Sequence, residues 1–230
     1  MAGRIAYYGN IVKDGLVLDL DAAKKDSYPG TGTAWNDISG NGNNGTLTNG
    51  PTFNSSNGGS IVFDGTNDYI NTVTATSLGI NSASTSFSIS IWFKTTGVNE
   101  YYLFDNYNGS ADISLRIDGG KIEVYMSATG TINAAQFGSG YNNGIWHNVI
   151  LTWNGSNTIT VYVDGISIGT NTTSITGSFE SNAAFQIGSR PAGGGSVFSG
   201  NISQIQVYNR ALTSTEITQN YNALKGRFGL

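Results

Sequence analysis

The sequence predicts an all-β fold, a two-sheet antiparallel jelly-roll sandwich with one short C-terminal helix. Three observations lead to this prediction. Short stretches in which apolar and polar residues alternate recur along the chain, and the stretches between them are rich in Asn and Gly, with 32 glycines among 230 residues. Charged residues make up only 11% of the chain, against about 25% in an average soluble domain. Because Gly, Asn, Ser and Thr favour turns over helices, this composition indicates many short strands.

The clearest strand is predicted over residues 87–93, where Phe87, Ile89 and Ile91 alternate with small or polar residues. Glycine-rich turns at 118–120 predict a hairpin between the stretches that flank them. About a dozen short strands at close spacing are typical of a sandwich. The other expected strands are 15–21, 60–65, 68–70, 100–104, 111–117, 121–126, 147–153, 158–163, 183–188 and 202–208.

One helix is expected near the C-terminus. Thr213 and Glu216 have the spacing of a capping box, in which each side chain satisfies a free backbone N–H of the first turn. Three apolar residues then fall on one helical face, and Gly226 is expected to end the helix.

A single domain is expected over residues 15–230. Residues 1–14 are too apolar for a free tail and are interpreted either as an edge strand or as an arm that docks on a neighbouring subunit. The net charge of −4 and the lack of a basic run argue against a nucleic-acid partner. No stretch approaches the about 20 apolar residues of a membrane-spanning helix. The lack of cysteine and of an apolar leader favours assembly in a reducing cytoplasm.

Three motifs carry a family resemblance. They are SFSISIWFK at 86–94, the pair WHNVILTW and ITVYVDG within 146–165, and FSGNISQIQVYNRALTSTEI at 198–217. Their order and spacing resemble those of laminin-G-like and pentraxin-like domains of the concanavalin A-like lectin group, over about residues 15–225. The resemblance implies a jelly roll of about 12–14 antiparallel strands in two packed sheets.

A narrower resemblance concerns the first 70 residues. The segments 15–22, 27–35, 37–47 and 63–70 are similar to laminin-G-like domains in structural proteins of tailed bacteriophages, especially marine ones. This resemblance implies a virion protein assembled in the host cytoplasm and exposed on the particle, as capsid decoration, tail or fibre. The partners it implies are other virion proteins or further copies of the chain in a homo-oligomer.

No catalytic residue is predicted. Retaining glycoside hydrolases of this fold carry alternating acids on one strand, because their chemistry needs two carboxyl groups about 5–5.5 Å apart. None of the four glutamates lies in such a motif. The nearest match is Asp19 and Asp21, which are expected on the outward polar face of their strand. His147, the single histidine, is interpreted as a satisfied strand residue, and one His without any Cys excludes a typical zinc site.

The family resemblance implies calcium at a rim loop, because the related domains hold it there with Asp, Asn and carbonyl oxygens. Asp64 and Asp68 match the family's segment at this loop, although the same segment is also a good turn. A second oxygen-rich loop is formed by Asp105, Asn106 and Asn108. Calcium is the only cofactor expected.

Tyrosines between the predicted strands are the candidates for glycan binding. A tyrosine offers an apolar ring and a polar hydroxyl, which suits a sugar. The alternative is that these rings pack sheet edges or a subunit interface. The candidates are Tyr101, Tyr102, Tyr107 and Tyr141, with Tyr125 nearby in the sequence.

Three functions stay open at this point. The first is a non-enzymatic, lectin-like virion surface protein that adheres through weak multivalent binding of cell-surface glycans. The second is a purely structural capsid cement protein without a ligand. The third is the glycan-binding module of a secreted carbohydrate-active enzyme.

Overall fold

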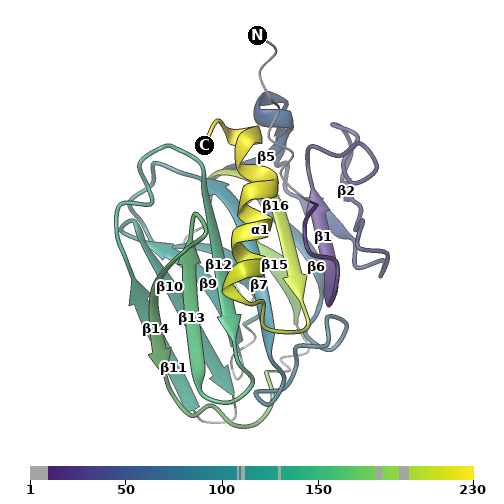
Figure 1. Ribbon diagram of the computed structural model, residues 1–230. Coiled ribbons are helices and arrows are strands. Elements are labelled where there is room, and N and C mark those ends of the chain that lie inside the picture. Colours follow the sequence, from purple (N-terminus) through teal and green to yellow (C-terminus); the bar gives the residue numbers. More distant parts are fainter. Residues whose placement is uncertain (1–9, 108, 110–111, 129–130, 180–182, 192–196) are drawn as a thin grey trace.

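Two antiparallel sheets packed face to face, with one helix near the C-terminus, make up the fold (Figure 1). The computed structural model describes residues 10–107, 109, 112–128, 131–179, 183–191 and 197–230. Within these residues each sheet has eight strands. The predicted fold class is therefore confirmed, with a few more strands than expected.

The first sheet has the order β14-β13-β12-β7-β16-β5-β4, and β1 pairs with β16 beside β5. Its long central strand β16 pairs with β7 on one side and with β1 and β5 in succession on the other. The strands are β1 (Leu16–Asp21), β4 (Thr52–Asn54), β5 (Ser60–Asp64), β7 (Phe87–Lys94), β12 (His147–Trp153), β13 (Thr158–Val163), β14 (Ile166–Thr172) and β16 (Ser199–Tyr208).

The second sheet has the order β11-β10-β9-β8-β15-β6-β3-β2. Its strands are β2 (Ala34–Trp35), β3 (Gly45–Thr48), β6 (Tyr69–Thr74), β8 (Tyr101–Asp105), β9 (Asp112–Asp118), β10 (Lys121–Ala128), β11 (Thr131–Phe137) and β15 (Ala184–Ile187). A short 3-10 turn, η1 (Ser56–Gly58), precedes β5.

The core lies between the two sheets and follows from the alternation that predicted the strands. Ile89 and Ile91 of β7 and Leu115 of β9 are fully buried in one continuous apolar cluster. The rings of Phe104 and Phe185, from neighbouring strands β8 and β15, stack with centroids 4.2 Å apart. Two large sheets with interdigitated apolar faces need no disulfide to hold them together.

The predicted hairpin turn is confirmed. Gly119 and Gly120 form a two-residue turn between β9 and β10, and both have positive φ angles of 54° and 81°. Asp164 and Gly165 join β13 to β14 in the same way, with φ angles of 52° and 79°. Positive φ at both central residues matches the twist of the strands, which explains the Gly-Gly and Asp-Gly sequences.

Five short or exposed strands were not expected from the sequence. β2, β3 and β4 lie in the Gly- and Asn-rich region that reads as continuous turn, and each has only two to four residues. The sequence of β11 lacks regular alternation of apolar and polar residues, although Phe137 at its end is buried, and β14 exposes most of its residues. Pairing with their neighbours, rather than their own pattern, makes these segments strands.

The C-terminal helix α1 (Ser214–Leu224) covers the outer face of the first sheet (Figure 1). Its capping box between Thr213 and Glu216 is confirmed. Gly226 was expected to end the helix, but it lies within a 3-10 turn, η2 (Lys225–Phe228), that directly follows α1. The helical segment ends at Gly229, which has a positive φ of 77°. None of the helices among the described residues is long and apolar enough to cross a membrane.

Aromatic stacking fastens this helical segment to the sheet. The ring of Trp92, which points away from the core as predicted, stacks on Phe228 at 4.2 Å and on Tyr221 at 5.7 Å. Trp146 packs on the other side of Phe228 at 4.8 Å. The outward face of β7 is therefore covered by the chain's own C-terminus.

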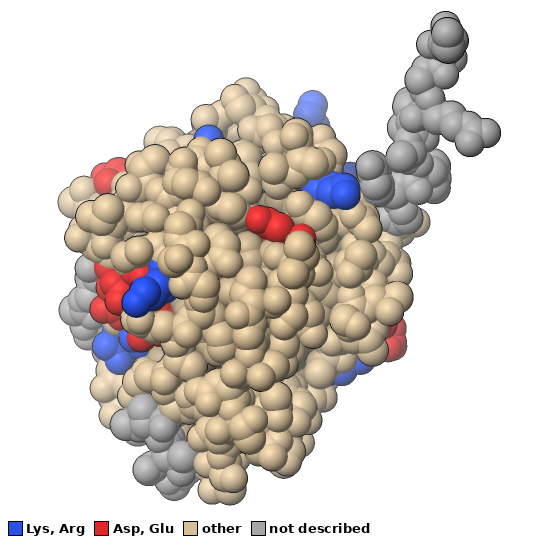
Figure 2. All heavy atoms as spheres, turned by 60° about the vertical axis from the view of Figure 1, so that its left-hand side comes forward, with Lys and Arg blue, Asp and Glu red and all other residues tan. Residues whose placement is uncertain are grey.

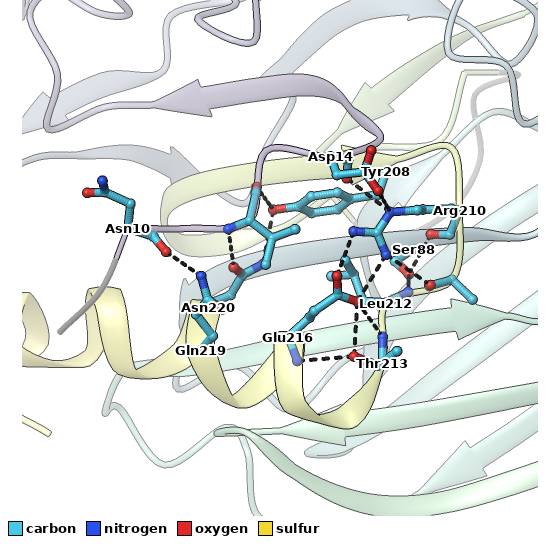
Figure 3. A network of polar contacts seen from close by, with 12 residues as sticks. Asn10, Asp14, Ser88, Tyr208, Arg210, Leu212, Thr213, Glu216, Gln219 and Asn220 are labelled. Atoms are coloured by element: carbon cyan, nitrogen blue, oxygen red, sulfur yellow. Dashed lines mark hydrogen bonds and ion pairs between the residues drawn. The ribbon is translucent and has the colours of Figure 1, made fainter.

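Most of the predicted N-terminal arm, residues 1–9, lies outside the described residues. Residues 10–14 lie against α1 and β16 (Figure 3). The backbone N–H of Val12 donates to Asn220 at 2.8 Å, and Gln219 donates to the carbonyl of Asn10 at 2.7 Å. This part of the segment is thus fixed to its own domain.

Candidate functional site

The candidate tyrosines do not form one surface. Tyr101 and Tyr102 are buried and Tyr107 and Tyr141 are half-buried. Tyr101 packs edge-on against the core ring of Phe198 at 5.9 Å. The ring of Tyr101 therefore packs a sheet edge, as the alternative interpretation expects, while the residue also lines a polar hollow at the rim.

Tyr102 and Tyr107 both contact the guanidinium group of Arg190, at 5.6 Å and 3.5 Å from the ring centroids. Tyr141 packs elsewhere, against the imidazole of His147 at 5.3 Å. Cation–π contacts of this kind stabilise both partners. Two of the four candidate rings are thus engaged with an arginine on the outer face of the second sheet.

The same outer face carries a cluster of charges centred on Arg116. Its guanidinium lies 2.8 Å from Glu100 and 3.7 Å from both Glu123 and Asp112, between the rings of Tyr102 and Tyr125. Figure 2 shows a surface with few charged side chains, on which one group of acidic and basic side chains lies together and others are scattered. The cluster around Arg116 thus brings acidic side chains and an arginine together on an otherwise sparsely charged domain.

Two buried carboxyl groups lie within this cluster. Burial, and then the nearby charge of Asp105, raise the pKa of Asp112 to about 8, although Arg116 and Arg190 act against this shift. Burial also raises the pKa of Asp105. Neither oxygen of Asp112 accepts a hydrogen bond from the described residues. Burial and the neighbouring Asp105 thus favour the protonated form of the Asp112 carboxyl.

The second predicted calcium loop does not fit a calcium ion. The amide oxygen of Asn106 accepts the N–H of Ile113 at 2.8 Å, and Asp105 accepts the N–H of Tyr107 at 2.7 Å. These oxygens hold the loop itself, and two arginines lie close to the carboxylates. Calcium needs six to eight free oxygen ligands. Asn108, the third predicted ligand, lies outside the described residues.

The first predicted calcium loop is a turn closed by its own carboxylates. Asp68 accepts the N–H of Asp64 at 3.0 Å, and Asp64 accepts the N–H of Thr66 at 2.7 Å. Burial raises the pKa of Asp68. Among the described residues no group of three or more acidic or His side chains could hold a metal. Calcium at Asp64 stays a prediction that would depend on neutral oxygen ligands.

Asp64 does, however, line a polar hollow of about 390 Å³ at the rim of the sandwich. The end of β5, the beginning of β16 and the beginning of β8 meet there, because Asp64 pairs with Ser199 across the two strands. One candidate of each predicted kind, Asp64 for calcium and Tyr101 for glycan, therefore lies at the same hollow. The lining residues are Asp64, Gly65, Thr66, Asn99, Tyr101, Val197 and Ser199.

A second hollow of about 280 Å³ adjoins the first and shares Ser199 with it. It lies at the end of β7, where Lys94 pairs with Asn201. We call the two hollows together the rim groove. The further lining residues are Lys94, Thr95, Thr96, Gly144, Gly200 and Asn201.

Hydroxyl, amide and carboxylate groups line the rim groove, and few apolar side chains do. Thr95 is held in place because its hydroxyl donates to the carbonyl of Ser199 at 2.7 Å. Gly200 has φ of 148° and lies so close to the carbonyl of Lys94 that a Cβ atom would clash at 2.3 Å. A shallow polar groove with fixed hydrogen-bonding groups can recognise hydroxylated ligands.

Most residues of the rim groove were missed by sequence reasoning. Asn99, Ser199 and Asn201 belong to no motif that points to a ligand, and they meet Asp64 only through strand pairing. The pairing of the strands could have revealed them. Aligning the end of β5 with the start of β16 places Ser199 beside Asp64, and aligning the end of β7 with β16 places Asn201 beside Lys94.

The residues tested for catalysis have structural partners. His147 lies 2.8 Å from Asp164 and 3.2 Å from Asn143, as expected for a satisfied strand histidine. Asp19 and Asp21 lie opposite Leu18 and Leu20 as predicted, but they are buried and not exposed to solvent. Leu16, which was expected on the same face as these leucines, packs instead in the outer cluster with Ile217, because the register shifts between Leu16 and Leu18. Arg227 pairs with Asp21 at 2.7 Å, so the chain's own C-terminus covers this face.

Comparison with known proteins decides the family. A family model described as "Concanavalin A-like lectin/glucanases superfamily", with the name Laminin_G_3, matches residues 64–218. The chain belongs to this family. No curated protein matches the sequence of this concanavalin A-like domain.

Solved structures show the same fold at low sequence identity. The binding domain of Paraclostridial Mosquitocidal Protein 1 is 20% identical, with a TM-score of 0.75, and the match covers 92% of this chain and 52% of that one. The binding domain of botulinum neurotoxin DC in complex with SialylT is 15% identical (TM-score 0.74, 92% and 52% covered). The same neurotoxin domain in complex with rat synaptotagmin II is 15% identical (TM-score 0.69, 93% and 52% covered). The concanavalin A-like domain thus spans about half of each.

Proposed function

We propose that the chain is a non-enzymatic, lectin-like domain that binds glycans in the rim groove. The observation that carries the proposal is the convergence of Asp64, Asn99, Tyr101 and Ser199 on one polar hollow at the strand ends. The family is one of lectins and glucanases. A similar toxin domain binds SialylT, and its complex with synaptotagmin adds a protein receptor as a second kind of ligand.

The affinity of a single groove should be low. The groove is open and polar, and few apolar groups line it, so a sugar would gain little from burial there. Weak sites become effective when many copies act together, since binding of one copy raises the local concentration for the next. Display on a virion surface, as capsid decoration, tail or fibre, would supply such copies. This setting rests on the resemblance of residues 15–70 to phage structural proteins.

The ion pairs formed by the carboxyl groups support a binding function without catalysis. Asp21 is paired with Arg227, and Glu100 and Glu123 are paired with Arg116. In the rim groove Asp64 is the only carboxylate among the described lining residues. Hydrolysis with retention needs two carboxyl groups about 5–5.5 Å apart. Among its described lining residues the groove therefore offers no acid–nucleophile pair.

A glycan array tests the proposal when the protein is displayed in many copies on fluorescent beads. The wild-type chain is expected to retain a subset of glycans, and Asp64→Ala and Tyr101→Phe are expected to lose them. Tyr162→Phe, at a half-buried position on β13 outside the groove, is the matched control.

Running the array with calcium and with a chelator tests the calcium prediction at Asp64 separately. Binding that needs calcium and is lost in Asp64→Asn would support an ion at this turn. If wild-type beads bind none of the glycans, the chain would instead be better explained as a structural capsid cement protein without a ligand.

A further inference from the structure

A separate pocket of about 350 Å³ lies between α1, the N-terminal segment and the outer face of β1 and β16. None of its described lining residues belongs to the rim groove. Asp19 and Gln204 contribute the polar wall, and Leu224 at the end of α1 contributes an apolar wall. Its volume is at the small end of the range of ligand pockets, about 300–1,000 Å³.

One polar atom of this pocket has no partner. Gln204 is only 3% exposed, and its amide nitrogen donates to the carboxylate of Asp19 at 2.9 Å. Its amide oxygen is buried and accepts no hydrogen bond from the described residues. Buried acceptors in native proteins nearly always have a donor. This oxygen lies beneath the pocket wall with almost no surface of its own, so its capacity to accept a hydrogen bond is unused among the described residues.

The charges that line the pocket indicate which kind of ligand it can hold. Asp19 lies 3.6 Å from the ammonium of Lys13, and Asp21 is paired with Arg227. Lys24 adds a second amine to the lining. A metal ion would meet these amines, and an anion would meet the two carboxylates. A neutral hydroxyl group can donate to a carboxylate and accept from a lysine amine, so it suits the mixed lining.

The apolar part of the lining completes the match. Ile38, Ala223 and Leu224 present aliphatic groups next to the polar wall. A sugar ring has an apolar C–H face beside its hydroxyl groups, and ligand pockets commonly combine an apolar wall with a few placed polar groups. We propose that this pocket is a second saccharide site that takes one small, neutral sugar, whether or not the rim groove binds glycan.

The N-terminal segment forms part of this site. Ile11 and Lys13 line the pocket, and the segment is fixed by the bond from Val12 to Asn220. Tyr208 also holds it, because its hydroxyl donates to the carbonyl of Val12 at 3.1 Å. The pocket is therefore built jointly by both ends of the chain.

Chemical-shift mapping on the full ¹⁵N-labelled chain tests the site. The probes are the methyl glycosides of glucose, galactose and mannose, with calcium chloride and sodium phosphate as charged probes. At least one glycoside is expected to shift the backbone amides of Lys24, Ile38 and Ala223. Shifts at these amides from only calcium or phosphate, or from no probe, would overturn the proposal.

Variants separate this pocket from the rim groove. Ala223→Trp should fill the pocket and weaken the glycoside at least tenfold, while Thr215→Trp, at an exposed position of the same helix, should not. Lys24→Ala removes an exposed lining amine without touching the core and should weaken binding about threefold. Tyr101→Phe tests the rim groove alone and should leave these shifts intact. Equal binding by Ala223→Trp and Thr215→Trp would contradict the site.

Discussion

The side-chain amide of Asn220 donates to the hydroxyl of Tyr208 at 3.0 Å, and each of these residues also bonds to Val12 (Figure 3). Three elements, the N-terminal segment, β16 and α1, thus meet in one closed set of hydrogen bonds. Burial raises the pKa of the Tyr208 hydroxyl, which keeps it protonated as a donor.

Replacing Asn220 with Ala should release this arrangement. The N–H of Val12 loses its acceptor and Tyr208 loses a donor, so the free energy of unfolding should fall by about 2–3 kcal/mol. Chemical denaturation measures the change, and limited proteolysis should show faster cleavage near residues 10–14. Thr215→Ala on the exposed face of α1 is the control. Equal stability of the two variants would show that Asn220 does not hold the segment.

Glu216→Gln should weaken the start of α1 in a pH-dependent manner. Its hydrogen bonds with Arg210, and then those with Thr213, lower the pKa of Glu216 to about 2. Because the pKa of Glu216 is lower in the folded chain than in the unfolded chain, its carboxylate adds to the free energy of unfolding above the unfolded pKa of about 4.3. This contribution is lost as the pH falls toward the folded pKa. At pH 7 the variant should be less stable by about 0.5–1 kcal/mol, because the pair is partly exposed.

Melting curves at several pH values check this prediction. The difference between wild type and Glu216→Gln should shrink between about pH 4.3 and pH 2. A difference that stays constant over this range would mean that the carboxylate charge contributes nothing.

Asp112→Asn should show the opposite pH dependence. The pKa of Asp112 is raised to about 8 in the folded chain, against about 3.9 in an unfolded one. Between these values the folded state holds the extra proton, so the free energy of unfolding of wild type falls as pH rises. The neutral variant should therefore gain more than about 1 kcal/mol over wild type between pH 5 and pH 8.

Urea titrations at the two pH values measure this gain, and Asp26→Asn at an exposed position should show none. If Asp112→Asn lost stability equally at both pH values, the carboxylate would be charged and well paired with Arg116 and Arg190.

Two buried tryptophans should respond differently to replacement by Phe. The indole N–H of Trp153 donates to the carbonyl of Ala83 at 2.9 Å, whereas that of Trp35 has no acceptor among the described residues. Both variants lose similar apolar area, but only Trp153→Phe breaks a buried hydrogen bond. It should cost about 1–2 kcal/mol more than Trp35→Phe by chemical denaturation. A larger cost for Trp35→Phe would contradict the assignment of partners.

The proposed display on a particle predicts self-association through the N-terminus. Residues 10–14 are fixed to α1, so residues 1–9 are the part to remove. Light scattering coupled to size exclusion should show an oligomer for the full chain and a monomer after deletion of 1–9. A monomer in both forms would contradict assembly through this segment.

The sequence predicted the fold well because alternation and turn chemistry are local signals. Strands 147–153 and 158–163 were predicted to the residue, since each has a clear buried face and a turn on both sides. β11 and β14 were missed because they are the edge strands of the two sheets, next to each other, and their sequences carry few apolar residues in regular alternation.

The candidate site was predicted less well, for a physical reason. A tyrosine's residue type does not say whether its ring faces solvent or the core, so the sequence leaves glycan binding and sheet packing open for Tyr101 and Tyr102, and the structure shows both as buried. Asp64 was placed at the rim because its segment matches a rim loop of the family that the chain resembles. Ser199 and Asn201 reach the same rim through long-range register, which no short motif encodes.

Glycan binding in the rim groove is tested most sharply by its affinity for a glycan that the array selects. Isothermal titration measures this affinity for wild type, Tyr101→Phe and Asp64→Ala. Tyr101→Phe removes one hydroxyl and keeps the packing on Phe198, so its melting temperature should equal that of wild type. We expect at least a tenfold loss of affinity in both variants and none in Tyr162→Phe. Unchanged affinity in Tyr101→Phe and Asp64→Ala would contradict glycan binding in this groove.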